Sequence, residues 1–170
     1  MSKQDFSNKV VLITGASSGI GAATAIHFAK KGAKITITGR NKDNLNKVAE
    51  ECKNAGGECL IVVADITSTK DCDELIKQTI DHYKKLDVLV NNAGILEVGS
   101  IENTSLQQYD NIFNTNVKSV YYLTMIAVPY LIQTKGNIVN VSSVAGTKSF
   151  PGKYLFPSKF RSMNGYLGLI

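Results

Sequence analysis

Short runs of apolar residues alternate along the chain with longer segments in which apolar residues recur every three or four positions. The short runs have the length of β-strands, and the periodic segments have the spacing of helices that bury one face. Strands that alternate with helices are typical of α/β proteins, in which helices cover both faces of a parallel sheet. The pattern therefore predicts a doubly wound α/β fold with a parallel sheet of about five strands. The expected strands are Val10–Thr14, Lys34–Thr38, Cys59–Val63, Val88–Val90 and Ile138–Val141.

The helices between these strands are predicted from caps and apolar faces. Ser68 is the expected N-cap of one helix, with Asp71 in its first turn and an apolar stripe behind it. The last helix is expected to be continuous from about Ser105 to Leu131. Its predicted core stripe consists of Leu106, Tyr109, Phe113, Val117, Val120, Thr124, Ala127 and Leu131.

A glycine-rich turn follows the first expected strand. Gly15, Gly19 and Gly21 lie where the backbone must bend sharply and approach a ligand closely, and Ser17 and Ser18 lie between them. The helix that follows presents backbone N–H groups and the positive end of its dipole, which suit a pyrophosphate. The alternative is that the glycines only connect a strand to a helix.

Other candidate ligand-binding residues also follow the carboxyl ends of expected strands. Arg40 follows the second strand, Asp65 and Ile66 follow the third, and Asn91–Gly94 follows the fourth. In open α/β sheets, ligands bind in the crevice at this edge. Each feature also has a simpler interpretation, namely a solvated arginine, a helix-capping or surface acid and an ordinary Asn/Gly turn.

Composition narrows the class of function. The chain has 170 residues, of which 44% are hydrophobic, and is expected to form a single domain over residues 1–170. Its net charge of +5 is scattered, which gives little support to nucleic-acid binding. The apolar segment Val120–Ile132 is too short to span a membrane. The three cysteines lack metal-ligand spacing, so no metal site is expected. Reduced thiols and a polar N-terminus favour a cytoplasmic location.

Taken together, these residues resemble the short-chain dehydrogenase/reductase family. Thr14–Gly21 matches every fixed position of its Thr-Gly-x-x-x-Gly-[Ile/Val/Leu]-Gly motif, and Asn91–Gly94 is identical to its Asn-Asn-Ala-Gly element. Asn116 and Ser143 match the asparagine of a family helix and the serine at a strand end. The resemblance covers about residues 9–152. It implies a Rossmann-like fold and hydride transfer between a nicotinamide and a small carbonyl or alcohol substrate.

The resemblance also implies which residues bind the cofactor. Asp65 would hold the adenine amino group, with Ile66 against the ring. Where an acidic residue would bind the ribose 2′-hydroxyl, this chain has Gly39 followed by Arg40, whose guanidinium suits a 2′-phosphate. We therefore expect NADP(H) rather than NAD(H). The remaining cofactor-binding residues would be Gly15, Ser17, Ser18, Gly19, Ile20, Gly21, Asn92, Ala93 and Gly94.

Four residues would carry the family's catalysis. Ser143 would steady the substrate carbonyl and Asn116 would hold a water in a proton relay. Tyr154 would donate the proton, and Lys159 would lower its pKa. An unperturbed tyrosine has a pKa of about 10, and moving it to around 7 requires roughly 4 kcal/mol of differential stabilisation.

The catalytic pair departs from the family's Tyr-x-x-x-Lys pattern. The usual spacing from the serine leads to Phe156 and Phe160, which have no ionisable group, whereas Tyr154 and Lys159 are one position too far apart. On a regular helix this changes their angular separation from about 40° to about 140°. We therefore expect residues 153–170 to diverge from the family, the family's last strands to be missing and the active site to be incomplete.

Two other functions remain open. One is a catalytically inactive NADP(H)-binding or interaction protein that pairs with another copy or with a full-length relative through its long helix. The other is a Rossmann-like methyltransferase, which has no use for Asn91–Gly94, Asn116 and Ser143 together. A P-loop phosphotransferase is excluded because no Gly-Lys-[Ser/Thr] follows the glycines. The substrate stays open among steroid, sugar, retinoid, fatty-acyl and xenobiotic carbonyls.

Overall fold

The computed structural model describes residues 5–100 and 102–143. This part of the chain forms one parallel sheet of five strands in the order β3-β2-β1-β4-β5. The chain starts at the centre of the sheet, moves outward to β3 and then crosses to the other side of β1. The predicted doubly wound, Rossmann-like fold is thus confirmed. The strands are β1 (Val10–Thr14), β2 (Lys34–Gly39), β3 (Glu58–Val63), β4 (Val88–Asn91) and β5 (Asn137–Asn140).

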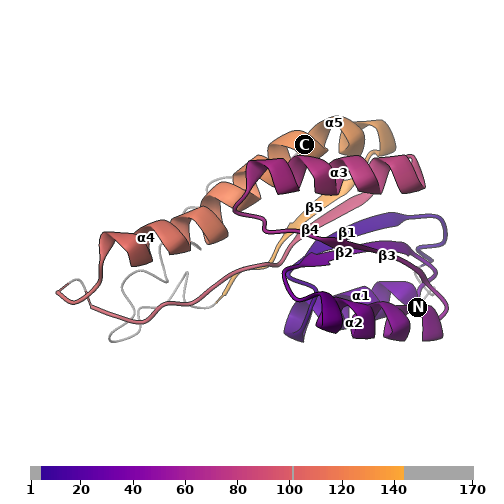
Figure 1. The fold of residues 1–170 in the computed structure, drawn as a ribbon. Coiled ribbons are helices and arrows are strands. Elements are labelled where there is room, and N and C mark those ends of the chain that lie inside the picture. The colour runs from indigo at the N-terminus through magenta and orange to yellow at the C-terminus, as the bar shows by residue number, and fades with distance from the viewer. Residues whose placement is uncertain (1–4, 101, 144–170) are drawn as a thin grey trace.

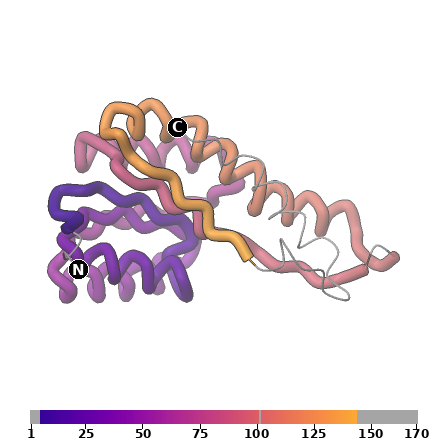
Figure 2. The backbone as a smooth tube through the Cα atoms, turned by 180° about the vertical axis from the view of Figure 1, so that it is seen from behind, coloured from indigo at the N-terminus to yellow at the C-terminus, as the bar shows by residue number. Residues whose placement is uncertain are grey.

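Helices cover both faces of this sheet, as Figures 1 and 2 show from opposite sides. Helices α1 and α2 lie on one face, and α3 and α5 lie on the other. The predicted cap of α3 is present, because the Ser68 hydroxyl accepts a hydrogen bond from the Asp71 N–H at 3.3 Å. The helices are α1 (Gly19–Ala29), α2 (Lys42–Asn54), α3 (Thr69–Tyr83), α4 (Leu106–Phe113), the π-helical turn η1 (Asn114–Lys118) and α5 (Ser119–Thr134).

The sheet separates two hydrophobic clusters. Val11 and Ile13 of β1 belong to the cluster that faces α1 and α2. Val10 and Leu12 of the same strand belong to the cluster that faces α3 and α5. Successive residues of a strand point to opposite faces, so a central strand of a covered parallel sheet is apolar along its whole length. This explains the unbroken apolar run at the start of the sequence pattern.

The long helix expected from Ser105 to Leu131 is interrupted, and this prediction was wrong for its first half. Leu106 is 83% exposed and Tyr109 is 42% exposed, although both were predicted as core. Ile112 and Leu123 are buried instead. The reason is η1, because a π-helical turn inserts one residue and rotates the preceding face by about 100°. After η1 the predicted stripe is buried at Val120, Ala127 and Leu131.

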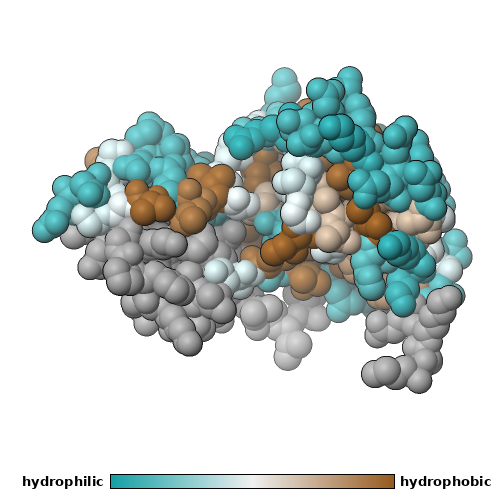
Figure 3. Space-filling view, turned by 90° about the horizontal axis from the view of Figure 1, so that it is seen from below, coloured by the Kyte–Doolittle hydropathy of each residue, from teal (hydrophilic) through white to brown (hydrophobic). Residues whose placement is uncertain are grey.

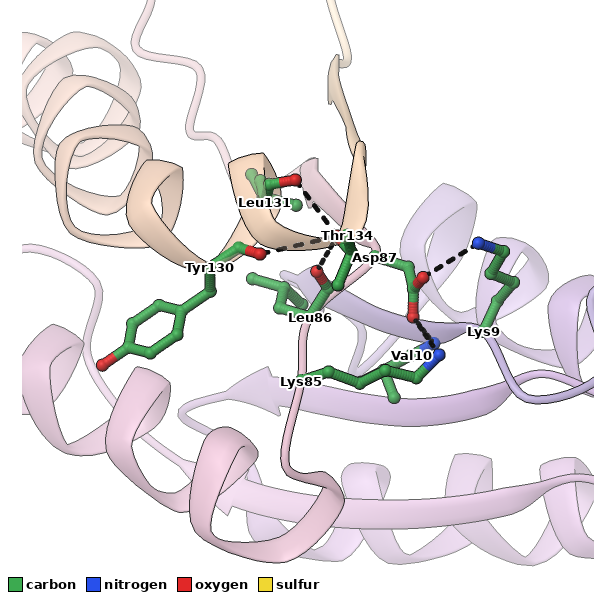
Figure 4. A network of polar contacts seen from close by, with 8 residues as sticks. All are labelled: Lys9, Val10, Lys85, Leu86, Asp87, Tyr130, Leu131 and Thr134. Atoms are coloured by element: carbon green, nitrogen blue, oxygen red, sulfur yellow. Dashed lines mark hydrogen bonds and ion pairs between the residues drawn. The ribbon is translucent and has the colours of Figure 1, made fainter.

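A buried carboxylate ties the beginning of β4 to β1 (Figure 4). Asp87 is 3% exposed and lies 3.0 Å from Lys9 Nζ, 2.9 Å from Lys85 Nζ and 2.9 Å from the N–H that opens β1. Burial opposes the ionisation of Asp87, but these hydrogen bonds outweigh it and hold its pKa below the usual value. Next to it, the Thr134 hydroxyl donates to the Leu86 carbonyl at 2.7 Å and fixes the end of α5.

The connection after β4 and helix α4 project together from the body of the molecule (Figures 1 and 2). We call this part the arm (residues 95–100 and 102–113). Leu96, Val98 and Leu106 of the arm are 49%, 61% and 83% exposed. Figure 3, which has the arm at the left, shows apolar side chains on it beside polar ones. Among the described helices, none is both long enough and apolar enough to cross a membrane.

Candidate functional site

A hollow of about 310 Å³ lies at the carboxyl ends of β1, β2, β3 and β4. Gly15, Gly39, Ala64 and Asn92 mark the four strand ends around it. This is the edge at which open α/β sheets bind ligands. The structure therefore brings together residues that lie far apart in the sequence. The predicted cofactor-binding residues on its wall are Gly15, Ser17, Ser18, Arg40, Asp65, Ile66, Asn92, Ala93 and Gly94.

Two glycines of the turn are required by close packing against the segment after β4. Gly15 has a φ of +63°, and a Cβ atom there would lie 2.7 Å from the Ala93 Cα. A Cβ atom on Gly21 would lie 2.5 Å from the Asn92 Nδ2. Any larger residue at either position would push the turn away from β4. The glycines thus give the hollow its shape by packing beneath it.

Helix α1 begins directly at the hollow. Its N-cap, Ser18, has an extended backbone, and within the described structure its side chain makes no capping hydrogen bond. The N–H groups in the first turn of a helix have no partner inside the helix, and the helix dipole makes this end positive. A Cβ atom on Gly19 would meet no atom within 4 Å, so the backbone can be approached there. This arrangement suits an anion such as a phosphate group.

The loop after β3 is held by its own hydrogen bonds. The Asp65 Oδ1 accepts from the N–H and the hydroxyl of Thr67 at 2.9 and 2.8 Å. The Asp65 N–H donates to the Asp71 carboxylate at 2.9 Å. This bond, together with one from Ser68, holds the pKa of Asp71 below its usual value. The Asp65 carboxylate is therefore fixed at the hollow, where Arg40 is exposed at the end of β2.

Thr14 and Asn92 join the glycine turn to β4. The Thr14 hydroxyl accepts from the backbone N–H groups of Asn92 and Ala93, both at 3.0 Å. The Asn92 side-chain amide donates to the carbonyls of Thr14 and Gly15 at 2.9 and 3.1 Å. Because four hydrogen bonds connect the two segments, they form one rigid wall of the hollow.

Asn116 is completely buried in η1 and contacts the beginning of the arm. Its Oδ1 accepts from the Ile95 N–H at 2.9 Å, and its Nδ2 donates to the Ile95 carbonyl at 2.8 Å. A buried asparagine needs partners for its amide, and the Ile95 backbone supplies them. Asn116 thus fixes the segment that follows Gly94.

Residues 9–159 match the sequence model of the short chain dehydrogenase family. The chain belongs to this family. Its members are oxidoreductases that use a nicotinamide cofactor. The matched range extends beyond the limit of residue 152 expected from the sequence and includes Tyr154 and Lys159.

Individual family members are similar over most of this chain. An 11-beta-hydroxysteroid dehydrogenase-like protein of Arabidopsis thaliana is 43% identical over 142 residues, which are 82% of this chain and 46% of that protein. The structure of a glucose dehydrogenase of Caenorhabditis elegans has 41% identity and a TM-score of 0.87, covering 96% of this chain and 67% of that one. A mutant short-chain dehydrogenase/reductase of Serratia marcescens has 29% identity and a TM-score of 0.92, with the same coverage. This chain thus spans about half of the plant relative's length.

The family's catalytic positions are placed only in part. Asn116 lies in η1, and Ser143 is half-buried beyond the end of β5. Tyr154 and Lys159 lie outside the described residues. Among the described residues, no group of three or more His, Cys, Asp or Glu side chains is placed to hold a metal ion.

The family motifs did not indicate every residue that lines the hollow. Thr67, Ile95 and Thr115 line the hollow but were not predicted. Ile95 directly follows the Asn-Asn-Ala-Gly element, and Thr115 directly precedes Asn116, so adjacency to a motif was the available signal. Three predicted residues of the glycine turn do not line the hollow, namely Gly19, Ile20 and Gly21.

Two larger hollows lie away from the glycine turn. One, of about 600 Å³, lies between the end of β3 and α3 and is bordered by charged side chains such as Lys70, Asp73 and Lys77. The other, of about 700 Å³, is an apolar groove along η1 and α5 that includes Val117 and Met125. Neither of them contains a helix start together with the motif residues of the family, so the smaller hollow is the better candidate for cofactor binding.

Proposed function

We propose that this chain binds NADP(H) at the 310 Å³ hollow and serves hydride transfer between the nicotinamide and a carbonyl or alcohol substrate. One observation carries the proposal, namely that the hollow joins the start of α1 to Arg40 and Asp65. A positive helix end, a guanidinium and a carboxylate are the groups that a phosphorylated adenosine would need.

Each part of the hollow has a proposed role. The N–H groups at the start of α1 bind the pyrophosphate, Arg40 binds the 2′-phosphate, and Asp65 and Ile66 hold the adenine. The rigid wall formed by Thr14 and Asn92 keeps the turn in place for this contact. Because the wall is already assembled, binding requires little reordering of the protein.

The proposed catalytic roles follow the family pattern. Ser143 orients the substrate oxygen, Tyr154 donates the proton and Lys159 favours the tyrosine phenolate. Asn116 positions the Ile95 backbone through two hydrogen bonds. In this proposal it also holds the water of the proton relay. The bound nicotinamide supplies or accepts the hydride.

Titration of the chain with NADPH and NADH tests the cofactor. We expect NADPH to bind more tightly, and Arg40→Glu to weaken NADPH by about 10- to 100-fold, because a hydrogen bond to a charged group contributes about 1.5–3 kcal/mol. The binding of NADH should change little. Lys47→Glu is the control, since Lys47 is an exposed residue of α2 outside the hollow and the substitution changes the net charge equally.

Two results would contradict the proposal. Tighter binding of NADH than of NADPH by the unmodified chain would exclude the NADP(H) preference, and no binding of either would exclude the site. A panel of carbonyl compounds, followed by the loss of reduced-cofactor absorbance, then tests turnover. The panel should include steroids and sugars, because the names of the two relatives above indicate those substrates for those proteins.

A second candidate function is that of a non-catalytic NADP(H)-binding protein that pairs with another copy or a full-length relative. The observation in its favour is the exposure of apolar residues along α5, where Met125 is 50% and Ile132 59% exposed. NADPH binding without turnover, together with a dimer that Met125→Lys dissociates, would support this function. Turnover by the monomer would exclude it.

A further inference from the structure

Lysines gather at the edge of the sheet that lies opposite the hollow. Because the strands are parallel, every connection from a helix into a strand reaches this edge. We define the amino edge as these connections, the segment before β1 and the first residue of each strand. Seven of its residues are lysines and three are acidic, which leaves an excess of four positive charges. The amino edge consists of residues 5–10, 30–34, 55–58, 84–88 and 135–137.

The edge that carries the hollow has the opposite sign. Its connections, which lead from strands into helices, contain one cation, Arg40, and three acidic residues, namely Asp65, Glu97 and Glu102. The charges are scattered along the sequence, but the fold separates them along the direction of the strands. The amino edge, at the end of the molecule away from the arm, is therefore its positive side (Figure 1).

Hydrogen bonds hold the starts of the strands side by side. The Lys34 N–H donates to the Lys9 carbonyl at 2.8 Å, and the Asp87 N–H donates to the Val10 carbonyl at 2.9 Å. The Asn137 N–H donates in turn to the Asp87 carbonyl at 2.9 Å. Neighbouring strands are about 4.8 Å apart, which is less than the screening length of about 10 Å at a salt concentration of about 0.1 M, so the potentials of the lysines add.

The acidic residues neutralise only part of this charge. Asp87 pairs with Lys9 and Lys85 (Figure 4). A carboxylate oxygen of Glu58 lies 3.8 Å from the Lys34 Nζ. Four positive charges of the amino edge therefore stay available to a partner. The lysines without an ion-pair partner among the described residues are Lys30, Lys31, Lys84 and Lys135.

The ends of the helices explain where most of these lysines lie. Lys30, Lys84 and Lys135 are the C-caps of α1, α3 and α5, where the helix dipole favours a cation. The dipole places only about half a negative charge at a helix end, so it offsets part of each lysine. All three side chains are exposed, and their ammonium groups can still contact a partner.

The chemistry of the amino edge favours an anionic surface over a nucleic acid. Its cations are all lysines, which act as point charges, whereas arginine is the usual residue for bidentate phosphate contacts. The nearby aromatic rings are not available for stacking on bases, because Phe6 packs against Phe28 and Tyr83 is only 8% exposed. Ile132, in the last turn of α5 before Lys135, is 59% exposed and adds an apolar group. Lipid headgroups accept both lysines and an apolar side chain.

We propose that the amino edge binds membrane surfaces that contain anionic lipids, with the hollow and the arm turned away from the bilayer. Each lysine held near such a surface strengthens binding about five-fold, because the negative surface potential attracts it. The chain lies on the surface in this arrangement and does not cross it. The hollow stays open to a nucleotide, but binding to the membrane does not depend on the proposed function.

Sedimentation with lipid vesicles tests this proposal on the whole chain. One set of vesicles contains phosphatidylcholine alone, and the other contains about 30% phosphatidylserine as the anionic lipid. At a salt concentration of about 0.1 M we expect binding to the second set only. At about 1 M, where the screening length falls to about 3 Å, this binding should be lost.

A fourfold variant and a matched control separate the amino edge from the net charge. The fourfold variant is Lys30→Gln/Lys31→Gln/Lys84→Gln/Lys135→Gln. It should weaken binding to the phosphatidylserine vesicles by about 100-fold or more, whereas the control should weaken it by less than about five-fold. The control replaces four exposed lysines outside the amino edge and lowers the net charge equally, as Lys42→Gln/Lys47→Gln/Lys70→Gln/Lys118→Gln.

Circular dichroism should show that both variants are folded. If the fourfold variant does not fold, the single substitution Lys31→Gln, outside the helix ends, should still weaken binding about five-fold. Equal weakening by the fourfold variant and the control would overturn the proposal, as would equal binding to both sets of vesicles or binding to neither. Tighter binding of an RNA oligonucleotide than of the phosphatidylserine vesicles would assign the amino edge to nucleic acid instead.

Discussion

Thr14 and Thr38 are register partners on β1 and β2, and both side chains are buried. The Thr14 hydroxyl accepts two backbone hydrogen bonds from the segment after β4. Among the described residues, the Thr38 hydroxyl has no hydrogen-bond partner. A buried hydroxyl without a partner carries a desolvation cost, whereas one with partners contributes to stability. The hydroxyl groups of these two threonines on adjacent strands therefore have opposite effects on the free energy of unfolding.

Replacing each threonine with valine should show this difference. We expect Thr38→Val to raise the free energy of unfolding by about 0.5–1.5 kcal/mol, because the shape is kept and the unpaired hydroxyl is removed. Thr14→Val should lower it by about 1–3 kcal/mol, because two buried N–H groups lose their acceptor. Urea unfolding measures both values. Equal effects of the two substitutions would contradict this account of the hydroxyls.

Asp87 provides a test that depends on pH. We expect Asp87→Asn to lower the free energy of unfolding at pH 7 by about 1–3 kcal/mol, a range that allows for solvent screening of the two partly exposed lysines. The folded-state pKa of Asp87 is below the unfolded value of about 3.9. Its stabilisation is therefore complete above that value and is lost as the pH falls through the folded pKa.

Urea unfolding from pH 7 down to pH 3 measures this effect, and the difference between the two proteins should shrink in acid. Asp81→Asn is the control, since Asp81 forms an exposed ion pair with Lys77. Exposed pairs contribute little, so we expect a change below about 0.5 kcal/mol. A difference at Asp87 that stays constant with pH would show that the charge is not the cause.

At the scale of helices and strands, the sequence was sufficient wherever local signals agreed. Ser68 and Asp71 predicted the start of α3, and the five apolar runs predicted the strands to within one or two residues. The interruption at Asn114–Lys118 could not be predicted, because a π-helical turn has no distinct residue pattern and periodicity was counted straight through it. Asn116 was the one sign, since an asparagine within an apolar stripe requires a partner.

We expect the two hydrogen bonds between Asn116 and the Ile95 backbone to stabilise the beginning of the arm. Asn116→Ala should lower the free energy of unfolding by about 1–3 kcal/mol, because both hydrogen bonds to Ile95 are lost. Hydrogen exchange at the Ile95 N–H should become faster. Asn111→Ala is the control, since Asn111 is exposed on α4 and should change stability by less than about 0.5 kcal/mol. Similar effects of both variants would refute a special role for η1.

At the candidate site, too, local motifs could be predicted from the sequence, whereas positions that depend on packing could not. Most of the motif residues predicted to bind the cofactor line the hollow, because each motif sits at the end of a strand, whereas Gly19, Ile20 and Gly21 do not line it. The position of Thr115 on that wall depends on how η1 brings the helix back toward β4, which is a property of packing.

At the scale of the whole molecule, β5 is one of the two outer strands of the described sheet. In the described part of the chain β5 pairs only with β4, and its Val139 is 45% exposed. A strand at the edge of a sheet that exposes an apolar side chain can pair with a strand of another chain. The exposed apolar residues of the arm provide a second surface, but they lie on a helix and a loop, whose backbone cannot extend a sheet.

We therefore expect Val139→Lys to reduce self-association, as measured by sedimentation velocity over a range of concentrations. Leu106→Lys makes the same change in charge on the arm, where the residue is 83% exposed. It should have the smaller effect if the strand edge is responsible. A larger effect of Leu106→Lys would assign self-association to the arm.

Asp87 anchors β4 from the position directly before the strand, and Asn92, directly after it, donates to the glycine turn beside the proposed cofactor site. Thermal tolerance and cofactor affinity should therefore respond to separate sets of substitutions along a single strand. Substitutions that strengthen the contacts of Asp87 should therefore leave the dissociation constant for the proposed cofactor unchanged.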